Sequence, residues 1–154
     1  MNPADITIVI VAWNQVEKTL DCLATVAALD TPPGRVLLVD NGSAPPLAAA
    51  VNARFPAVEM LRLADNHGFA GGYNAGIEHA LDGGAAAVLL LNNDTLPAPD
   101  ALDRLGEEMG KANDIGLVTA KITYAADPRR IWTVGANLNV FLDLKDGGQG
   151  QLDT

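Results

Sequence analysis

The strongest constraint on the fold is a regular alternation of short apolar segments with segments whose apolar residues recur at helical spacing. Ile6–Asn14 (ITIVIVAWN) is β-branched and largely apolar, which is typical of a strand covered on both faces. Four strand–helix units in succession predict an α/β fold, Rossmann-like and doubly wound, with a mainly parallel sheet and right-handed crossovers. Further strands are predicted over residues 35–43, 58–66, 85–94 and 115–124, and helices over 16–27, 47–54, 71–81 and 102–109.

The pattern weakens after Tyr124. The segments IWTVG (131–135) and NVFLDL (139–144) predict two short strands. The last residues, KDGGQGQLDT, have no packing pattern, so we expect a flexible tail or a chain cut at its C-terminus. The expected organisation is one ligand-binding part over residues 1–135, followed by short strands and a tail over 136–154.

Charge and composition exclude several classes of protein. The 19 acidic and 10 basic residues give a formal charge of -9, which disfavours DNA or RNA as a partner but leaves a small phosphate ligand open if a divalent cation accompanies it. The single cysteine, Cys22, cannot form an internal disulfide. No apolar run approaches the ~18 residues of a membrane span and no signal-peptide pattern is present, so we expect a soluble, cytoplasmic protein without a transmembrane segment.

Polar residues follow each of the first four predicted strands. In parallel sheets, ligands bind at the carboxyl ends of the strands, so these residues predict a site at one edge of the sheet. They are Trp13-Asn14, Asp40-Asn41-Gly42-Ser43, Asn66-His67-Gly68 and Asn92-Asn93-Asp94.

Asp94 follows an apolar strand and stands beside an amide and a hydroxyl. These groups are hard oxygen ligands, suited to Mg2+ or Mn2+ that takes its remaining ligands from water and substrate phosphates. The alternative is that Asn93-Asp94-Thr95 caps the helix that follows.

Asp40 and Trp13 also allow two interpretations each. Asp40 belongs either to a simple Asp-Asn-Gly turn or to a site in which its carboxylate accepts the imide N–H of uracil or thymine. Trp13 is either core filler or a platform on which a base stacks. Together the two residues predict a nucleotide pocket.

The glycine-rich stretch 65–76 (DNHGFAGGYNAG) fits neither the G-x-G-x-x-G dinucleotide fingerprint nor a Walker A loop. We expect Gly71 and Gly72 to open a helix whose Ile77 and Leu81 face inward. The glycines allow close packing of that helix on a strand, and they also allow backbone N–H groups to approach a substrate, with Asn74 available for hydrogen bonds. These two roles are compatible.

Four segments occur in an order that is typical of one enzyme family. They are VIVAWNQVEKTLDCLATV, VLLVDNGS, NHGFAGGYNAGI and LLLNNDTLPAPDAL. The chain resembles the large inverting family 2 of glycosyltransferases with the GT-A fold, above all its bacterial rhamnosyltransferase-like branch, over about Ile6 to Gly135. The resemblance implies that residues 1–135 form the part of a GT-A domain that binds the nucleotide-sugar donor.

The resemblance also implies roles for individual residues. Asp94 falls on the metal carboxylate of the family's D-x-D-type motif, Asn93 lies near the donor ribose, and Asp40 and Trp13 fall where an acid reads the base and an aromatic ring stacks on it. Asn66, Gly71 and Asn74 lie in the loop beneath the donor sugar. The full set of donor-binding candidates is Trp13, Asn14, Asp40, Asn41, Asn66, Gly71, Asn74 and Asn93, with Asp94 as ligand of Mg2+ or Mn2+.

The chain departs from the branch in two places. Tyr73 stands where the branch often has Asn, and the acidic Glu-Asp motif that supplies the base for the acceptor hydroxyl has no counterpart before Thr154. The catalytic base is therefore unassigned in this chain.

The implied function is metal-assisted, inverting transfer of a sugar from a UDP or dTDP donor, with dTDP-rhamnose as the candidate from the branch. The implied acceptor is a saccharide or a lipid-linked saccharide, in bacterial cell-envelope polysaccharide synthesis at the inner membrane face. The alternative is a non-catalytic nucleotide-binding or assembly module of the same fold. A nucleotidyltransferase is disfavoured, because the region after the first strand (AWNQVEK) has no Gly-rich basic loop.

Overall fold

A computed structural model describes residues 1–138 and 144–153. The chain forms two compact units, Met1–Gly106 and Glu107–Thr154. In the described part of the chain, none of the helices is both long and apolar enough to cross a membrane.

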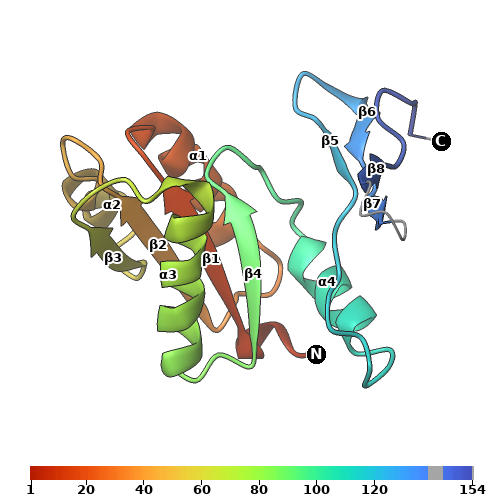
Figure 1. Cartoon of the computed structure of the whole chain (residues 1–154), viewed down its shortest axis with the longest axis horizontal. Coiled ribbons are helices and arrows are strands. Elements are labelled where there is room, and N and C mark those ends of the chain that lie inside the picture. The colour runs from red at the N-terminus through yellow and green to blue at the C-terminus, as the bar shows by residue number, and fades with distance from the viewer. Residues whose placement is uncertain (139–143, 154) are drawn as a thin grey trace. The chain divides into compact units, whose positions relative to one another are not determined.

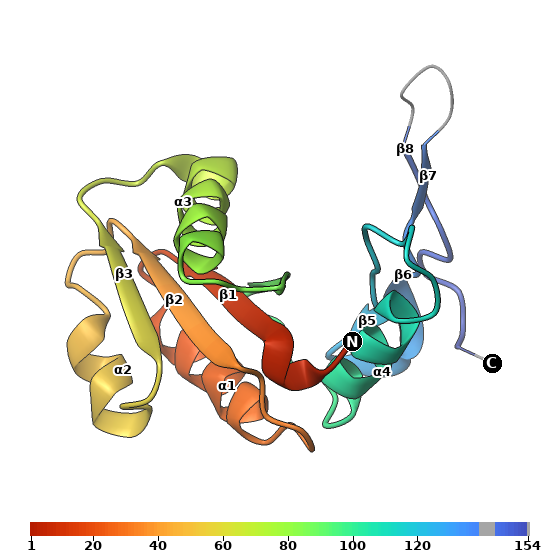
Figure 2. The same ribbon diagram turned by 90° about the horizontal axis from the view of Figure 1, so that it is seen from below.

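The first unit is built on a four-stranded parallel sheet with the strand order β3-β2-β1-β4 (Figure 1). Helices α1 and α2 lie on one face of this sheet and α3 lies on the other (Figure 2). The predicted doubly wound parallel sheet is therefore confirmed, with β1 in its interior. The elements of the first unit are β1 Ile6–Ala12, α1 Val16–Ala27, β2 Arg35–Asn41, α2 Ala48–Arg54, β3 Glu59–Leu63, α3 Gly68–Asp82 and β4 Ala87–Asn92, with a 3-10 turn at Pro3–Asp5 before β1. Helix α4 (Ala101–Met109) follows β4 and includes the boundary between the two units.

The sheet is buried on both faces because its central strands, β1 and β2, carry apolar residues at most positions, on both sides. Along β1 the side chains alternate, so Ile8 and Ile10 pack with α1, whereas Val9 packs with α3. The α1 face is the larger core, and Leu23 of α1 and Leu102 of α4 join it with almost no exposed surface. Each fully buried aliphatic side chain stabilises the fold by ~1.5–3 kcal/mol.

Helix α3 begins earlier than predicted. It starts at Gly68, whose φ of +72° lies in the left-handed region that favours glycine, and not at Gly71. The face against the sheet consists of small residues four apart, Gly72, Gly76 and Ala80. Ile77 is partly buried against this core as expected, but Leu81 is 54% exposed, so its predicted inward orientation is wrong.

The predicted fifth strand over 115–124 is wrong for most of its length. Only Ile122–Tyr124 forms a strand, β5, which pairs antiparallel with β6 (Asp127–Thr133) through a turn at residues 125–126. This hairpin partner is close in sequence, so pairing with it closes only a very short loop. The residues IWT of the predicted strand 131–135 lie in β6, as expected.

The second unit contains another antiparallel pair, β7 (Ala136–Leu138) with β8 (Leu144–Asp146). The strand predicted over 139–144 shares only Leu144 with β8. Its residues 139–143 lie outside the described part of the chain.

Replacing Gly76 by alanine tests the close packing of α3. The added Cβ would lie 2.5 Å from Val9 Cγ1 and 2.9 Å from Val39 Cγ2, both on buried central strands. We expect Gly76→Ala to lower the free energy of unfolding by ~1–3 kcal/mol in urea titrations, despite the better helix propensity of alanine. Gly116→Ala, which enters open space, is the control and should change stability by less than ~0.5 kcal/mol. Equal stability of both variants would contradict this packing.

Candidate functional site

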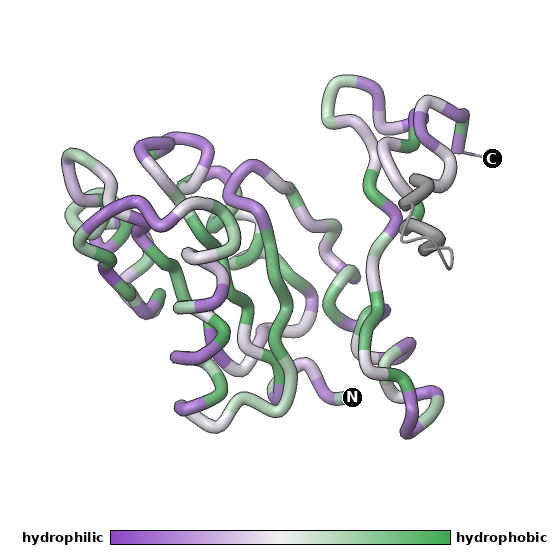
Figure 3. The backbone as a smooth tube through the Cα atoms, in the orientation of Figure 1, coloured by the Kyte–Doolittle hydropathy of each residue, from purple (hydrophilic) through white to green (hydrophobic). Residues whose placement is uncertain are grey.

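The carboxyl ends of the four parallel strands meet at one edge of the sheet, as predicted. In register, Ala12 lies beside Asp40, and Val11 lies beside Asn92. The loops that leave this edge are largely hydrophilic, whereas the strands that enter it are apolar (Figure 3). The sheet therefore gathers polar groups from separate parts of the sequence at one rim.

A pocket of about 240 Å³ lies in this rim. Trp13, at the end of β1, is 52% exposed and lines it, so Trp13 is not core filler. No side chain in the lining carries a formal charge. The lining residues are Val11, Trp13, Gln15, Asn41, Asn66, Gly68, Phe69 and Asn93.

Asn41 organises the glycine-rich loop. Its side chain is buried, and Nδ2 donates to Asn66 Oδ1 at 3.1 Å and to the Gly68 carbonyl at 3.0 Å. The backbone N–H of His67 donates to Asn41 Oδ1 at 2.9 Å, and that of Gly68 donates to Asn66 Oδ1 at 2.8 Å. These bonds fix the loop between β3 and α3 and occupy the amide of Asn41 within the protein.

The glycines of α3 permit close packing, which is one of the two roles predicted for them. A Cβ on Gly72 would lie 2.7 Å from Val11 Cγ1, and one on Gly71 would lie 2.7 Å from the Cβ of His67. Asn74 is exposed on α3. Neither Gly71 nor Asn74 is among the residues that line the pocket, so the structure does not bring them together with Trp13 there.

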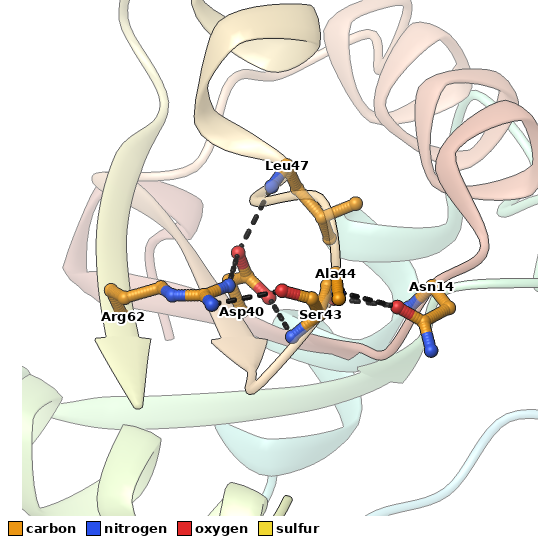
Figure 4. Close-up of polar contacts among 6 residues, drawn as sticks. All are labelled: Asn14, Asp40, Ser43, Ala44, Leu47 and Arg62. Carbon is orange, nitrogen blue, oxygen red and sulfur yellow. Dashed lines mark hydrogen bonds and ion pairs between the residues drawn. The ribbon is translucent and has the colours of Figure 1, made fainter. Parts of the chain in front are cut away.

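Asp40 is fully buried and its carboxylate is shared among three donors (Figure 4). Oδ1 accepts the backbone N–H of Ser43 at 2.9 Å, and Oδ2 accepts the N–H of Leu47 at 3.0 Å and pairs with Arg62 Nη1. Burial alone would raise the pKa of Asp40, but hydrogen bonds from Ser43, Leu47 and Arg62 outweigh it and hold the pKa below its usual value. The role of Asp40 as a base reader stays a prediction, and it competes with this structural role.

Asn14 connects the loops after β1 and β2 (Figure 4). Its backbone N–H donates to Ser43 Oγ at 3.0 Å, and its Oδ1 accepts the N–H of Ala44 at 2.7 Å. Asn14 adopts a left-handed conformation with φ of 57°, which asparagine tolerates better than most residues. Asn14 therefore holds the backbone next to Trp13 in place, and its side chain is engaged inside the protein.

At the end of β4, the side-chain amides of Asn92 and Asn93 make hydrogen bonds within the described residues, whereas the carboxylate of Asp94 does not. Tyr73 Oη donates to Asn92 Oδ1 at 2.9 Å, and Asn93 Nδ2 donates to Thr19 Oγ1 at 3.0 Å. Asp94 is exposed, and within residues 1–138 and 144–153 its carboxylate makes no hydrogen bond or ion pair with the protein.

Asp94 does not cap a helix. Helix α4 begins only at Ala101, and the backbone carbonyl of the preceding residue, Asp100, accepts the N–H of Arg104 at 3.1 Å. The capping alternative for Asp94 is therefore wrong, and the carboxylate is available to a ligand.

Two buried groups close to Asp94 stay protonated. Burial, followed by the charge of Asp94, raises the pKa of Cys22 to about 12. Burial, then Cys22 and Asp94, raises the pKa of Tyr73 to about 12. Cys22 is therefore not a nucleophile at neutral pH, and Tyr73 remains a hydrogen-bond donor to Asn92.

The carboxylate of Asp94 is a hard oxygen ligand, of the kind that suits a divalent cation which keeps most of its water ligands. Among the described residues there is no group of three or more His, Cys, Asp or Glu side chains that could enclose a metal ion. Mg2+ is commonly held by one or two carboxylates together with water and substrate phosphates. A single exposed carboxylate meets that requirement only when a phosphate ligand is present.

Phe69 and Gln15 are pocket residues that the sequence interpretation missed. Phe69 is 72% exposed, next to a glycine at the start of a helix, and an aromatic residue in such a polar, glycine-rich loop was the signal available in the sequence. A second depression, of about 260 Å³, lies at the amino ends of the strands around Arg35 and Gly83. Parallel sheets bind ligands at the other end, so the pocket beside Trp13 is the candidate site.

The chain matches the family described as Glycosyl transferase family 2 over residues 7–150. It is similar to the solved mannosyltransferase PcManGT from Pyrobaculum calidifontis in complex with GDP-Man and Mn2+, with a TM-score of 0.59 and 20% identity over 72% of this chain and 33% of that one. It is also similar to S. aureus TarS 1-349 in complex with UDP-GlcNAc, with a TM-score of 0.59 and 15% identity over 80% of this chain and 40% of that one.

Comparison with curated proteins gave no match. The chain spans less than half of the length of either solved structure, and at these identities the likeness shows the shared fold.

Replacing Asp40 by asparagine tests the structural role of its carboxylate. Since hydrogen bonds lower the folded-state pKa, the stabilisation is present above about pH 4 and is lost as the pH falls through that pKa. We expect Asp40→Asn to lower the free energy of unfolding by ~2–4 kcal/mol at pH 7, and by less at pH 3, in urea titrations. Asp21→Asn, on the exposed side of α1, is the control. Unchanged stability with weaker UDP binding would instead mean that Asp40 contacts the ligand.

Proposed function

This chain belongs to glycosyl transferase family 2, and we propose that it holds a nucleotide-diphospho-sugar at the carboxyl edge of its parallel sheet. The observation that carries the proposal is the pairing of an uncharged, partly aromatic pocket with the exposed carboxylate of Asp94 at the same rim. The first suits a base, and the second suits the cation that accompanies a diphosphate.

The pocket and the end of β4 meet at Asn93. Asn93 lines the pocket, and the next residue in the chain is Asp94, so a ligand in the pocket would lie beside the residue that carries the carboxylate. A nucleotide-diphospho-sugar has its base at one end and its charge in the middle. We assign the base to the pocket beside Trp13 and the diphosphate to the neighbourhood of Asp94.

Asp94 would hold Mg2+ or Mn2+ together with the donor's phosphates. A cation bound there supplies Lewis-acid stabilisation of the departing nucleoside diphosphate, worth several kcal/mol in enzymes of known mechanism. The chain's own part is to orient the donor. Thr19 of α1 binds Asn93 and Tyr73 of α3 binds Asn92, so helices on both faces of the sheet hold the backbone that leads to Asp94.

The finer features of the proposal rest on the sequence resemblance. They are a UDP or dTDP donor with dTDP-rhamnose as candidate, inversion at the anomeric carbon, and a saccharide or lipid-linked acceptor in bacterial cell-envelope polysaccharide synthesis, at the cytoplasmic side of the inner membrane. Inversion requires a base that deprotonates the acceptor hydroxyl as it attacks, and we assign no residue of this chain to that role.

Replacing Asp94 by asparagine tests the proposed function. The change removes the charge that attracts the cation. We expect Mn2+ to increase the affinity of the natural chain for a UDP-sugar or dTDP-sugar, and we expect this increase to be ~10- to 100-fold smaller in Asp94→Asn. Because Asp94 is exposed and its carboxylate makes no hydrogen bond or ion pair with the described residues, the melting temperature should stay unchanged. Calorimetric titration of both proteins with and without Mn2+ measures the effect.

Asp82→Asn is the matched control, since it removes an equal charge at the far end of α3 and should bind the donor as the natural chain does. If Asp94→Asn keeps the whole metal-dependent gain, Asp94 is not the ligand. If the natural chain binds no nucleotide sugar at all, the proposed function is wrong.

A further inference from the structure

Phe69 shares a pocket with Trp13 although the two residues come from different elements. Trp13 follows β1 and Phe69 lies in the first turn of α3, and both line the pocket of about 240 Å³. Their exposed fractions are 52% and 72%, respectively. Single exposed apolar residues are common on protein surfaces, but two large aromatic rings at one concave, polar rim indicate a ligand surface.

Phe69 is exposed, but the ring of Tyr73 packs against it and fixes its position. Its ring packs edge-to-face on Tyr73, one helical turn along α3, with centroids 4.8 Å apart and an interplanar angle of 62°. Tyr73 itself is buried, and its hydroxyl donates to Asn92 Oδ1 at 2.9 Å. The ring of Phe69 is therefore tied through Tyr73 to the end of β4, two residues before Asp94.

The polar groups that remain free in the pocket form a mixed set. Asn41 is fully engaged, but Asn66 Nδ2, Asn93 Oδ1 and the Gln15 carboxamide make no hydrogen bond to the residues that the structure describes. Together they offer donors and acceptors without charge. A carboxamide complements the adjacent N–H and C=O of a pyrimidine edge, because it presents one acceptor and one donor side by side.

The size of the pocket limits what it holds. Pockets for drug-sized ligands measure ~300–1,000 Å³, so a pocket of about 240 Å³ accepts one ring system rather than a whole nucleotide sugar. A nucleobase is a flat, neutral ring with mixed hydrogen-bonding edges, so it meets the limits that this lining sets. A phosphate has no counter-charge there, since no lining side chain is cationic.

We propose that Phe69 is a base-binding residue that packs against the donor base from the α3 side, with Trp13 on the β1 side and Gln15 at the edge of the base. Tyr73 acts as a positioning residue, because it holds Phe69 without touching the ligand pocket. This inference rests on the proposed function, and it adds a second aromatic contact and a neutral reader to it. It also gives the tyrosine at position 73 a role other than contact with the sugar.

The test compares ligands with and without a base. UDP, dTDP and inorganic pyrophosphate, each with Mn2+, are titrated calorimetrically into the natural chain, Phe69→Ala and Phe69→Trp. Since stacking on one aromatic side chain contributes ~1–3 kcal/mol per base, Phe69→Ala should bind UDP and dTDP about tenfold more weakly or worse. Pyrophosphate binding should stay the same, and Phe69→Trp should restore nucleotide binding. Leu81→Ala, another exposed apolar residue of α3, is the control and should change nothing.

Fluorescence adds a signal that a purely structural role would not move. In a Trp132→Phe background, Trp13 is the only tryptophan, so UDP should quench its emission and pyrophosphate should not. Quenching should persist in Phe69→Ala at saturating UDP.

Each outcome separates the two proposals. If the natural chain binds UDP and Phe69→Ala binds it equally well, the inference is wrong while the proposed function stands. Equal loss of pyrophosphate binding in Phe69→Ala would also overturn the inference, because the residue would then support the site in general. Absence of nucleotide binding by the natural chain overturns the proposed function and the inference with it. Should Phe69→Ala fail to fold, Phe69→Leu gives the same comparison.

Discussion

The buried charge of Asp40 fixes the part of the rim that lies around the end of β2. A carboxylate without solvent contact is costly unless its lone pairs are filled, and here Ser43, Leu47 and Arg62 fill them. These partners come from the loop after β2, the start of α2 and strand β3, so one side chain fixes three elements at once. Ser43 in turn accepts a hydrogen bond from the backbone N–H of Asn14, which lies in the neighbouring loop after β1.

Asp40 therefore contributes to the position of Trp13 indirectly, through Ser43 and Asn14. Asn14, held at a left-handed φ by two hydrogen bonds to the loop after β2, directly follows Trp13 in the chain. On the other side of the pocket, small residues of α3 let that helix approach the sheet, and the helix start presents Phe69. Trp13 and Phe69 thus line one pocket for two reasons. Hydrogen bonds fix the loop after β1, and the small residues of α3 let that helix pack close to the sheet.

The sequence predicted the parallel sheet because every central strand is apolar at both of its faces, a local property that needs no partner to be recognised. It did not predict the end of the sheet, because Ile122–Tyr124 found a partner in the adjacent β6, and such a choice depends on competition between distant and local pairings. The polar rim followed from strand ends alone. The engagement of Asp40 did not, since it depends on the β2–β3 register that places Asp40 beside Arg62. An arginine within the strand EMLRL was the only sign of it.

Arg62 balances the charge of Asp40 inside the protein, so Asp94 is the exposed carboxylate next to the end of β4, where the proposed function places the donor phosphates. A diphosphate is itself anionic, and the chain as a whole carries a formal charge of -9, so direct contact between carboxylate and phosphate would be repulsive. On the proposed function, a divalent cation between them reverses the sign of that interaction, whereas the neutral pocket beside Trp13 would bind the base with or without the cation. On the proposed function, the protein thus separates recognition from charge neutralisation: the base is read by rings and amides, and the phosphates are held only when a cation joins them to Asp94.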